Sequence, residues 1–270
     1  MRLTHNHLEK YIQQCRVDGQ NTETIKVKHR NLRIFFGFCA GKEITPELLS
    51  DWRKYIAERY KTPRSRNAKV CNTNVFLEYL GLKELRIKSF ECNHHILYSK
   101  KRESVTIGEL KKMLAYTEKT GDSRTHLLLR TLALTGIRSG EIQHITVEAV
   151  KAGYTAFIHH KQPRKVLLPD SLCRTLREYA DSQNIISGPI FLTRNGLPVH
   201  PRNIGTELKQ IAEKVGIPKD KINPTAFRIL FANTYYEKYD DLSGLTDLLG
   251  VKDLNMTVLY VKENNSPKEK

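Results

Sequence analysis

The chain has 270 residues, 39% of them hydrophobic, so it can bury one large core or two ordinary ones. Lysine and arginine number 45 against 29 acidic residues, giving a formal charge of +16, which predicts a polyanionic partner. No run approaches the roughly 18 apolar residues of a membrane span, and the first residues lack an apolar signal region. We therefore expect a cytoplasmic, nucleoid-associated protein that binds nucleic acid.

Cysteine and histidine are not spaced as metal ligands. The cysteines include no C-x-x-C pair, which predicts free thiols packed in the interior. They are Cys15, Cys39, Cys71, Cys92 and Cys173. The pairs His94-His95 and His159-His160 are followed by no further ligand at the usual distance along the chain. We expect no metal and no other cofactor.

The first eighty residues predict a bundle of four helices with a basic rim, because apolar residues recur at helical spacing. The helices are expected over about 7–16, over about 22–39, from Thr45 onward, and from Pro63 to Gly81. Thr45 followed by Pro46 is typical of an N-cap and a first helical position. The fourth helix carries Arg64, Arg66 and Lys69, which could form a solvated face. Given the charge excess, we favour contacts with DNA phosphates.

Residues 82–103 lose helical periodicity and are rich in lysine and arginine, the composition of an exposed basic connector. We place a linker at 86–103, and we expect Lys100, Lys101 and Arg102 to contact DNA. It separates a domain of residues 1–85 from a domain of residues 104–262, and residues 263–270 form a polar tail.

The second domain is predicted to be helical except for one hairpin. Helices are expected over about 107–118, 124–134, 171–182, 201–215, 224–239, 242–249 and 255–261. Residues 154–160 and 165–169 have the composition of strands, with Lys161-Gln162-Pro163-Arg164 as the turn between them. The sequence therefore predicts a mainly α fold with a small β-hairpin.

Three distant segments could bring charged side chains to one phosphate. In LTGIRSGEI, Arg138 occupies a corner between two helices. In PTAFR, Arg228 follows a helix start and lies on an otherwise apolar face. In LLGVKDLNMTVLY, glycine ends one helix and Tyr260 falls on the next. Arg138 alone would more often be a corner arginine paired with a carboxylate, and Tyr260 alone a packing tyrosine. The combination favours a functional site.

Together these segments resemble the tyrosine recombinase, or phage integrase, family, including its Xer-like site-specific recombinases. T-G-x-R-x-x-E, a basic hairpin, a helix start with x-x-x-R, and L-L-G followed ten residues later by tyrosine occur in the family's order. The resemblance covers most of the chain. It implies an N-terminal helical core-binding (SAM-like) domain and a tyrosine-recombinase catalytic domain.

The resemblance implies that Arg138 and Arg228 hold the scissile phosphate while Tyr260 attacks it and forms a 3′-phosphotyrosine bond. Glu141 would support Arg138 or a neighbouring backbone group. No metal or nucleotide is required. Tyr235, Tyr236 and Tyr239 are rival nucleophiles, but their positions inside the preceding helix fit packing better.

More than one residue near the hairpin turn could take the role of the family's catalytic lysine. Lys161 matches the family lysine that protonates the 5′-oxygen leaving group, and an ordinary surface role is the alternative. Arg164 and Lys165 lie close by and compete for the role, or else contact DNA.

Two positions depart from the family pattern. Histidine is usual where Thr225 stands, and histidine or tryptophan where Val251 stands. Thr225 can donate only a neutral hydrogen bond, and Val251 none. A lost charge-assisted contact is worth about 1.5 to 3 kcal/mol, or roughly ten- to a hundredfold in rate, which predicts a slow enzyme.

The resemblance further implies a homotetramer on paired sites in double-stranded DNA. Two alternatives stay open. The first is a catalytically weakened or inactive relative that only binds DNA, for which Thr225 and Val251 are the best support. The second is a relaxing enzyme that cuts and reseals the same strand, as type IB topoisomerases do.

Overall fold

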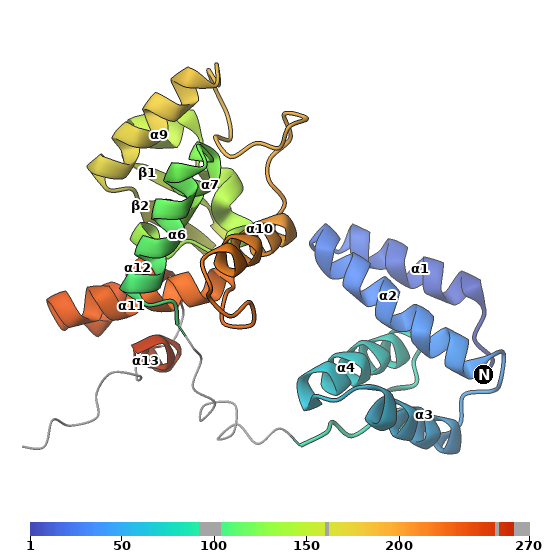
Figure 1. Cartoon of the computed structure of the whole chain (residues 1–270). Coiled ribbons are helices and arrows are strands. Elements are labelled where there is room, and N and C mark those ends of the chain that lie inside the picture. Colours follow the sequence, from blue (N-terminus) through green and yellow to red (C-terminus); the bar gives the residue numbers. More distant parts are fainter. Residues whose placement is uncertain (92–103, 160–161, 252–253, 262–270) are drawn as a thin grey trace, which may run out of the picture. The chain divides into compact units, whose positions relative to one another are not determined.

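The computed structural model describes residues 1–91, 104–159, 162–251 and 254–261. The chain divides into two compact units, residues 1–97 and 98–270 (Figure 1). Helices dominate both, and the strands within the described ranges form one two-stranded antiparallel sheet. The predicted mainly α fold with a small hairpin is therefore confirmed. Several residues selected from the sequence lie outside the described residues: Cys92, His94, His95, Lys100, Lys101, Arg102, His160, Lys161 and 263–270.

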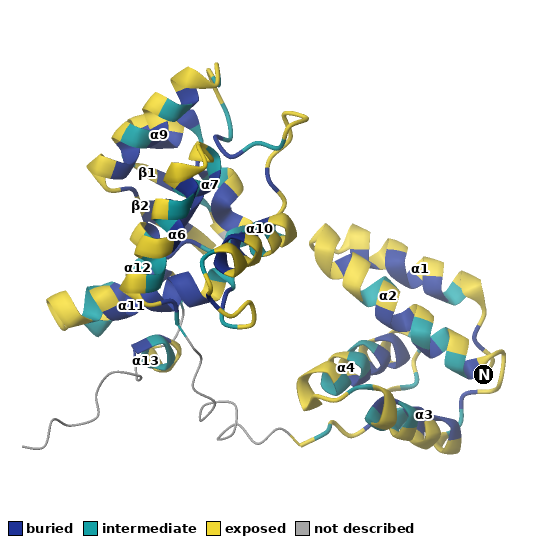
Figure 2. Ribbon diagram, viewed as in Figure 1, coloured by how far each residue is buried: buried dark blue, intermediate teal, exposed yellow. Residues whose placement is uncertain are grey.

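Four helices build the first unit. They are α1 (His5–Val17), α2 (Thr22–Cys39), α3 (Pro46–Arg59) and α4 (Pro63–Tyr79), followed by the 3-10 turn η1 (Lys83–Leu85). The side chains of Asn21, Thr45 and Thr62 cap three of these helices by accepting hydrogen bonds from first-turn N–H groups. Figure 2 shows their buried faces turned inward. Phe35 and Trp52 are fully buried, and their ring centroids lie 5.2 Å apart.

Residues 86–90, whose composition predicts an exposed linker, contact the four-helix bundle instead. The side-chain amide of Asn74 accepts a hydrogen bond from the Ile87 N–H (2.8 Å) and donates one to the Ile87 carbonyl (2.9 Å). Asn67 holds Phe90 in the same two-bond manner, at 2.7 and 2.8 Å. These side chains satisfy backbone groups as a neighbouring strand would, so residues 86–90 belong to the first unit.

Helices return in the second unit around a central α7. Its elements are α6 (Ile107–Lys119), α7 (Ser123–Thr135), η2 (Ser139–His144), α8 (Val147–Ala152), α9 (Asp170–Ser182), α10 (Pro201–Lys214), α11 (Pro224–Tyr239), α12 (Leu242–Leu249) and α13 (Leu254–Val261). Helix α7 packs against α6, α9 and α11, and its residues Leu128, Leu129 and Leu132 are fully buried. Within the described parts of the chain, no helix is both long and apolar enough to cross a membrane.

The hairpin has a tighter connection than the sequence predicts. Strand β1 (Tyr154–His159) pairs with β2 (Gln162–Leu167), and His159 lies opposite Gln162. Residues 162–164, predicted as turn, are therefore strand. Because side chains alternate along a strand, this register turns Arg164 and Val166 inward, where both are buried, and leaves Lys165 exposed.

The described cysteines are free thiols, and most of them are buried. Cys15, Cys39 and Cys173 are free and buried as predicted, whereas Cys71 is free but exposed on α4. Among the residues that the structure describes, no three His, Cys, Asp or Glu side chains gather as metal ligands.

Gly136 shapes the corner that leads to Arg138. It ends α7 in the left-handed conformation, with φ of 58°. A Cβ at this position would lie 2.5 Å from Cδ1 of Phe231 in α11. Both the backbone angle and the close approach of α11 require glycine here.

Gly136→Ala should lower the free energy of unfolding of the second unit. The left-handed backbone alone costs about 1 to 2 kcal/mol for a residue with a Cβ, and the overlap with Phe231 adds to this cost. Gly188→Ala is the matched control, because Gly188 has φ of 76° and no heavy atom within 4 Å of an added Cβ. Denaturant unfolding should show the larger loss for Gly136→Ala. Equal losses would mean that the approach of Phe231 is unimportant.

Candidate active site

Arg138 is held at the start of η2 by Glu141. One carboxylate oxygen of Glu141 accepts a hydrogen bond from the Arg138 backbone N–H (3.0 Å), and the other accepts one from Arg138 Nη1 (2.8 Å). Arg138 Nη2 donates to the Gly250 carbonyl at 3.3 Å, although the two residues are 112 positions apart. The Arg138 side chain keeps 30% of its surface exposed. These contacts fix the orientation of the Arg138 side chain, which is also accessible to a ligand.

Arg228 lies deeper, on α11, with 3% of its surface exposed. Its Nη1 donates to the Gly136 carbonyl (2.6 Å) and its Nη2 to the Leu249 carbonyl (2.5 Å). These two carbonyls belong to the ends of α7 and α12, where helix geometry leaves carbonyl groups without helical partners. Arg228 therefore joins the two helix ends. Its buried Nε has no hydrogen-bond partner among the described residues.

Tyr260 is brought next to Arg228 by the packing of α13 against α11 and α12 (Figure 1). The half-buried ring of Tyr260 has its centroid 5.5 Å from Cζ of Arg228. One turn earlier on α13, Thr257 is fully buried and its hydroxyl lies 2.8 Å from that of Thr246 on α12. Thr246 donates its own proton to the Leu242 carbonyl (2.7 Å), so Thr257 is the donor between the two hydroxyls.

The rival tyrosines make other contacts on α11. The Tyr235 hydroxyl donates to Asp241 at 3.4 Å, and its ring centroid is 4.7 Å from that of Tyr239. Tyr236 packs against a small apolar cluster that includes Leu245. The geometry favours Tyr260 as the tyrosine associated with the two arginines.

Positive charge exceeds negative charge where these segments meet. Arg138, Arg164 and Arg228 are here called the arginine cluster. Glu141 forms ion pairs with Arg138 and Arg164, and Arg228 lies within electrostatic range of both arginines. Burial, and then the charge of Arg138, lowers the pKa of Arg228, while Tyr260 opposes this shift. Because cations that repel one another are stabilised by an added anion, the cluster is suited to bind a phosphate.

The Glu141 carboxyl is strongly held as a carboxylate. Burial would raise its pKa, but the backbone N–H of Arg138 and the charges of Arg164 and Arg138 outweigh burial and lower the pKa below its ordinary value. Glu141 is 3% exposed and also receives a hydrogen bond from Arg164 Nε at 3.1 Å. It therefore supports both arginines.

The hairpin residues divide between the two faces of the sheet. Arg164 is 5% exposed, so the expectation that it contacts DNA at the surface does not fit its position. Lys165 is exposed on the opposite face, with its Nζ 4.2 Å from the centroid of the Tyr154 ring. Lys165 therefore points away from the arginine cluster and is a poor competitor for the role of Lys161. Lys161 itself lies outside the described residues.

The two positions that depart from the family pattern lie beside the cluster. Thr225 is exposed in the first turn of α11, one helical turn before Arg228. Val251 follows the end of α12 and packs against the apolar cluster beneath α13. Its backbone N–H donates to the Thr246 carbonyl at 3.3 Å. The side chain of Val251 has no polar atom, so it adds packing but no hydrogen bond.

The basic residues of α4 that are expected to contact DNA differ in how far their charged groups are occupied by hydrogen bonds within the protein. Arg64 is exposed. Arg66 donates to the carbonyls of Tyr60 (2.6 Å) and Ala57 (2.7 Å), and so satisfies the C-terminal end of α3. Lys69 donates to Asn31 at 2.6 Å. Arg64 is thus the member of the three that remains most available to a phosphate.

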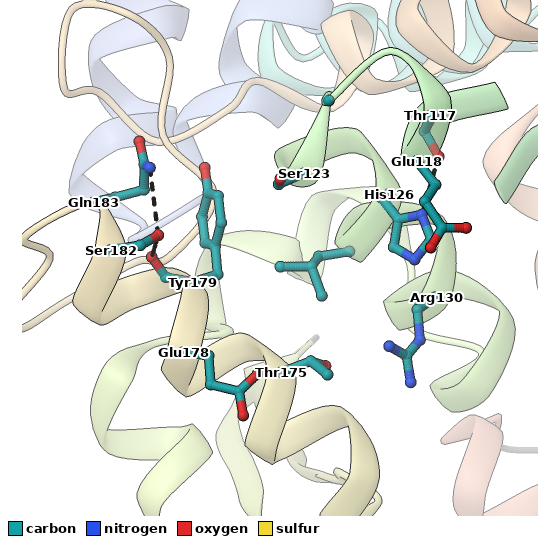
Figure 3. A pocket seen from close by; sticks show the side chains of 12 residues that line it. Thr117, Glu118, Ser123, His126, Arg130, Thr175, Glu178, Tyr179, Ser182 and Gln183 are labelled. Carbon is teal, nitrogen blue, oxygen red and sulfur yellow. Dashed lines mark hydrogen bonds between the residues drawn. The ribbon is translucent and has the colours of Figure 1, made fainter. Parts of the chain in front are cut away.

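A cavity of about 440 Å³ opens elsewhere in the second unit, between α7 and α9. Figure 3 shows His126 and Arg130 on one wall and Glu178 and Tyr179 on the other. The cavity is not lined by Arg138, Arg228 or Tyr260, so it is separate from the arginine cluster.

Comparison with known proteins gives the family. The model of the phage integrase family matches residues 103–266, more than half of the chain. The protein therefore belongs to the phage integrase family, as the three sequence segments predicted.

Relatives of known name are tyrosine recombinases. Tyrosine recombinase XerD of Staphylococcus saprophyticus subsp. saprophyticus is 28% identical over 172 residues, which cover 58% of each protein. Tyrosine recombinase XerC of Xylella fastidiosa strain 9a5c is 30% identical over 134 residues, covering 49% of this chain and 43% of the relative. The chain thus spans about half the length of the curated relatives it matches.

Solved structures share the fold over nearly the whole chain. A lambda integrase dimer bound to a COC′ core site matches with a TM-score of 0.73 and 17% identity, covering 100% of this chain and 99% of that one. The recombinase XerH bound to its difH substrate matches with a TM-score of 0.72 and 18% identity, covering 96% and 82%. Because the sequence identities are low, the structural similarity establishes the fold of this chain and nothing more.

Glu141→Gln should destabilise the second unit by about 3 to 5 kcal/mol at neutral pH, because it leaves the buried Arg164 and the partly exposed Arg138 without their anion. The folded-state pKa of Glu141 is lowered, so its stabilisation is present above about pH 4.3, the ordinary glutamate value, and fades as the pH falls through the lower folded-state pKa. Denaturant unfolding across an acidic pH series should show the variant and the native protein converging. The exposed Glu178→Gln is the control. A difference independent of pH would contradict the assignment.

Proposed function

We propose that the protein is a site-specific DNA recombinase that cuts and rejoins strands through a 3′-phosphotyrosine at Tyr260. The observation that carries the proposal is the meeting of Arg138, Arg228 and Tyr260 from three distant segments. Membership of a family whose named relatives are tyrosine recombinases supports it.

In the proposed reaction, the Tyr260 oxygen attacks the scissile phosphorus. The phosphotyrosyl bond forms as the bond from phosphorus to the 5′-oxygen breaks. Tyr260 loses its proton to solvent, and the 5′-oxygen gains one, for which we propose Lys161 as the donor. Rejoining runs the same steps in reverse, with the 5′-hydroxyl of the partner strand as the attacking group. The phosphotyrosyl bond conserves the energy of the broken bond, so the cycle needs neither metal nor ATP.

The arginines act on the charge of the transition state. Both guanidinium groups retain N–H donors beyond those used by the carbonyls, and arginine stays charged through the reaction. Donors aimed at a developing negative charge in a partly buried site lower the barrier more than they would in water. Arg138 is the accessible member, so the phosphate meets it first. Arg228 lies deeper and adds a second positive charge within electrostatic range of Arg138.

Binding to duplex DNA is proposed to rest on phosphate contacts. The formal charge of +16 provides long-range attraction, and Arg64, Lys100, Lys101 and Arg102 are the proposed contacts. We propose a homotetramer on paired sites, acting on DNA of the nucleoid in the cytoplasm. The lambda integrase structure is bound to a COC′ core site and the XerH structure to its difH substrate, which supports DNA as the partner.

A suicide substrate should trap the proposed intermediate. Duplexes with a randomised core are selected for binding, and the selected sequences are rebuilt with a nick beside the candidate scissile phosphate, so that the short fragment with the 5′-hydroxyl diffuses away. The native protein should accumulate a covalent adduct resistant to denaturation. Tyr260→Phe should bind but form none, because it lacks the nucleophilic oxygen. Tyr239→Phe, a change in an exposed tyrosine of α11, should form the adduct as the native protein does.

Three outcomes of this assay separate the candidates. Adduct with recombinant product on unnicked paired sites supports the recombinase. Adduct with relaxed but unrecombined DNA supports an enzyme that reseals the same strand. Tight binding by the native protein with no adduct refutes the proposed chemistry and supports a DNA-binding relative.

Thr225→His should accelerate adduct formation. A histidine one turn before Arg228 adds a donor that can carry charge beside the phosphate, worth about ten- to a hundredfold in rate. Thr225 is exposed, so the change should leave the unfolding transition unaltered. The rate constant on the nicked duplex, with Thr225→Asn as a neutral donor control, measures the effect. An unchanged rate would show that this position does not limit catalysis.

A further inference from the structure

Arg164 is buried on the inner face of the hairpin, where apolar residues are usual. Its side chain is 3% exposed. Its Nε donates to Glu141 at 3.1 Å, and its Nη1 donates to the Leu248 carbonyl at 3.2 Å. Arg164 therefore joins the hairpin to two other elements, η2 and the end of α12.

We propose that Arg164 is a positioning residue that fixes the spacing between the phosphate-binding arginines and the helix that carries Tyr260; the inference rests on the proposed function. The connection has two parts. The Glu141 oxygen that accepts from Arg164 also accepts from Arg138, so the two guanidinium groups are tied through one atom. On its other side, Arg164 holds the end of α12, from which the chain continues to α13.

Three arginines contact three consecutive carbonyls at this helix end. Arg164 donates to Leu248, Arg228 to Leu249 and Arg138 to Gly250. Carbonyls in the last turn of a helix lack helical partners and carry the negative end of the helix dipole, so they attract cations. The end of α12 thus contacts all three members of the arginine cluster and fixes their positions relative to one another.

Arginine suits this position better than lysine. Its Nε and Nη1 lie on a rigid planar fork and reach the carboxylate and the carbonyl at once, whereas a lysine ammonium is a single point of charge. Gly250 contributes to the fit, because a Cβ there would overlap Arg164 Nη1. The backbone after α12 therefore lies directly against the guanidinium.

The remaining donor of Arg164 argues against a role in stability alone. Its buried Nη2 has no hydrogen-bond partner among the described residues. Replacing buried ionic groups by well-packed apolar side chains is often neutral or stabilising. Val166, two residues along the same strand face, is such an apolar side chain. The presence of an arginine at this buried position is therefore better explained by a role in positioning the groups that it contacts.

Single-turnover formation of the covalent adduct on the nicked duplex tests the proposal. The final amount of adduct, its amplitude, reports the folded fraction of the protein, and the rate constant reports the geometry of the site. Arg164→Lys keeps the charge but loses one of the two contacts. It should bind the duplex with native affinity, reach native amplitude, and react about tenfold or more slowly, as misplaced catalytic groups do. Val166→Ala is the matched control for a weakened hairpin. It should lower the thermal midpoint while keeping the native rate constant.

A second pair of variants tests the same contact with Arg164 intact. Gly250→Ala would push Arg164 away from the end of α12, and it should slow the reaction as Arg164→Lys does. Gly216→Ala is its control, since Gly216 has a positive φ of 74° but no heavy atom within 4 Å of an added Cβ. It should react at the native rate. This pair decides the matter if Arg164→Lys does not fold.

The outcomes separate this inference from the proposed function. If the native protein forms the adduct and Arg164→Lys or Gly250→Ala reacts at the native rate constant, the positioning role is overturned and the recombinase chemistry stands. If Val166→Ala slows the reaction as much as Arg164→Lys does, the role of Arg164 is structural. If the native protein binds the duplex without forming an adduct, both proposals fall.

Discussion

The carbonyl end of helix α12 is the point on which the candidate active site depends. Arginines from a helix corner, a strand and a second helix converge there because the last carbonyls of a helix require donors. A guanidinium group has five donors, so each arginine can satisfy these carbonyls and still present N–H groups to a ligand. The same helix end leads into α13. One local requirement, hydrogen-bond satisfaction at a helix terminus, therefore brings together residues separated by more than a hundred positions.

The side chains of the arginine cluster are held by contacts within the protein itself. Glu141 offsets part of the positive charge, and the carbonyls hold the side chains in place, so little side-chain ordering remains for the binding step. The first unit contributes differently. Two of its basic side chains, Arg66 and Lys69, satisfy groups inside the bundle. Net charge alone therefore overstates the number of side chains that are free to meet a phosphate.

Much of the architecture follows from the sequence, because helix periodicity and capping are local signals. The helices other than the short α8, the hairpin and the placement of Arg138, Arg228 and Tyr260 near one another agree with expectation. The misjudged features depend on contacts distant in sequence. Two asparagine side chains hold residues 86–90 against the bundle, although their composition suggests an exposed linker. The sequence pattern predicts Arg164 in a turn, whereas the strand register, which begins at Gln162, turns its side chain inward. The hydroxyl pair of Thr246 and Thr257 carries no local signal, because each residue is unremarkable on its own helix.

The shared oxygen of Glu141 has an evolutionary consequence. Because Arg138 and Arg164 are neutralised by the same atom, a substitution at any of the three positions changes the electrostatic environment of the other two, and their effects will not add. A substitution at one of these sites alone is therefore expected to be more destabilising than a simultaneous substitution at all three. Among divergent members of the lineage, the corner glutamate and the hairpin arginine are expected to be inherited, or lost, as a unit.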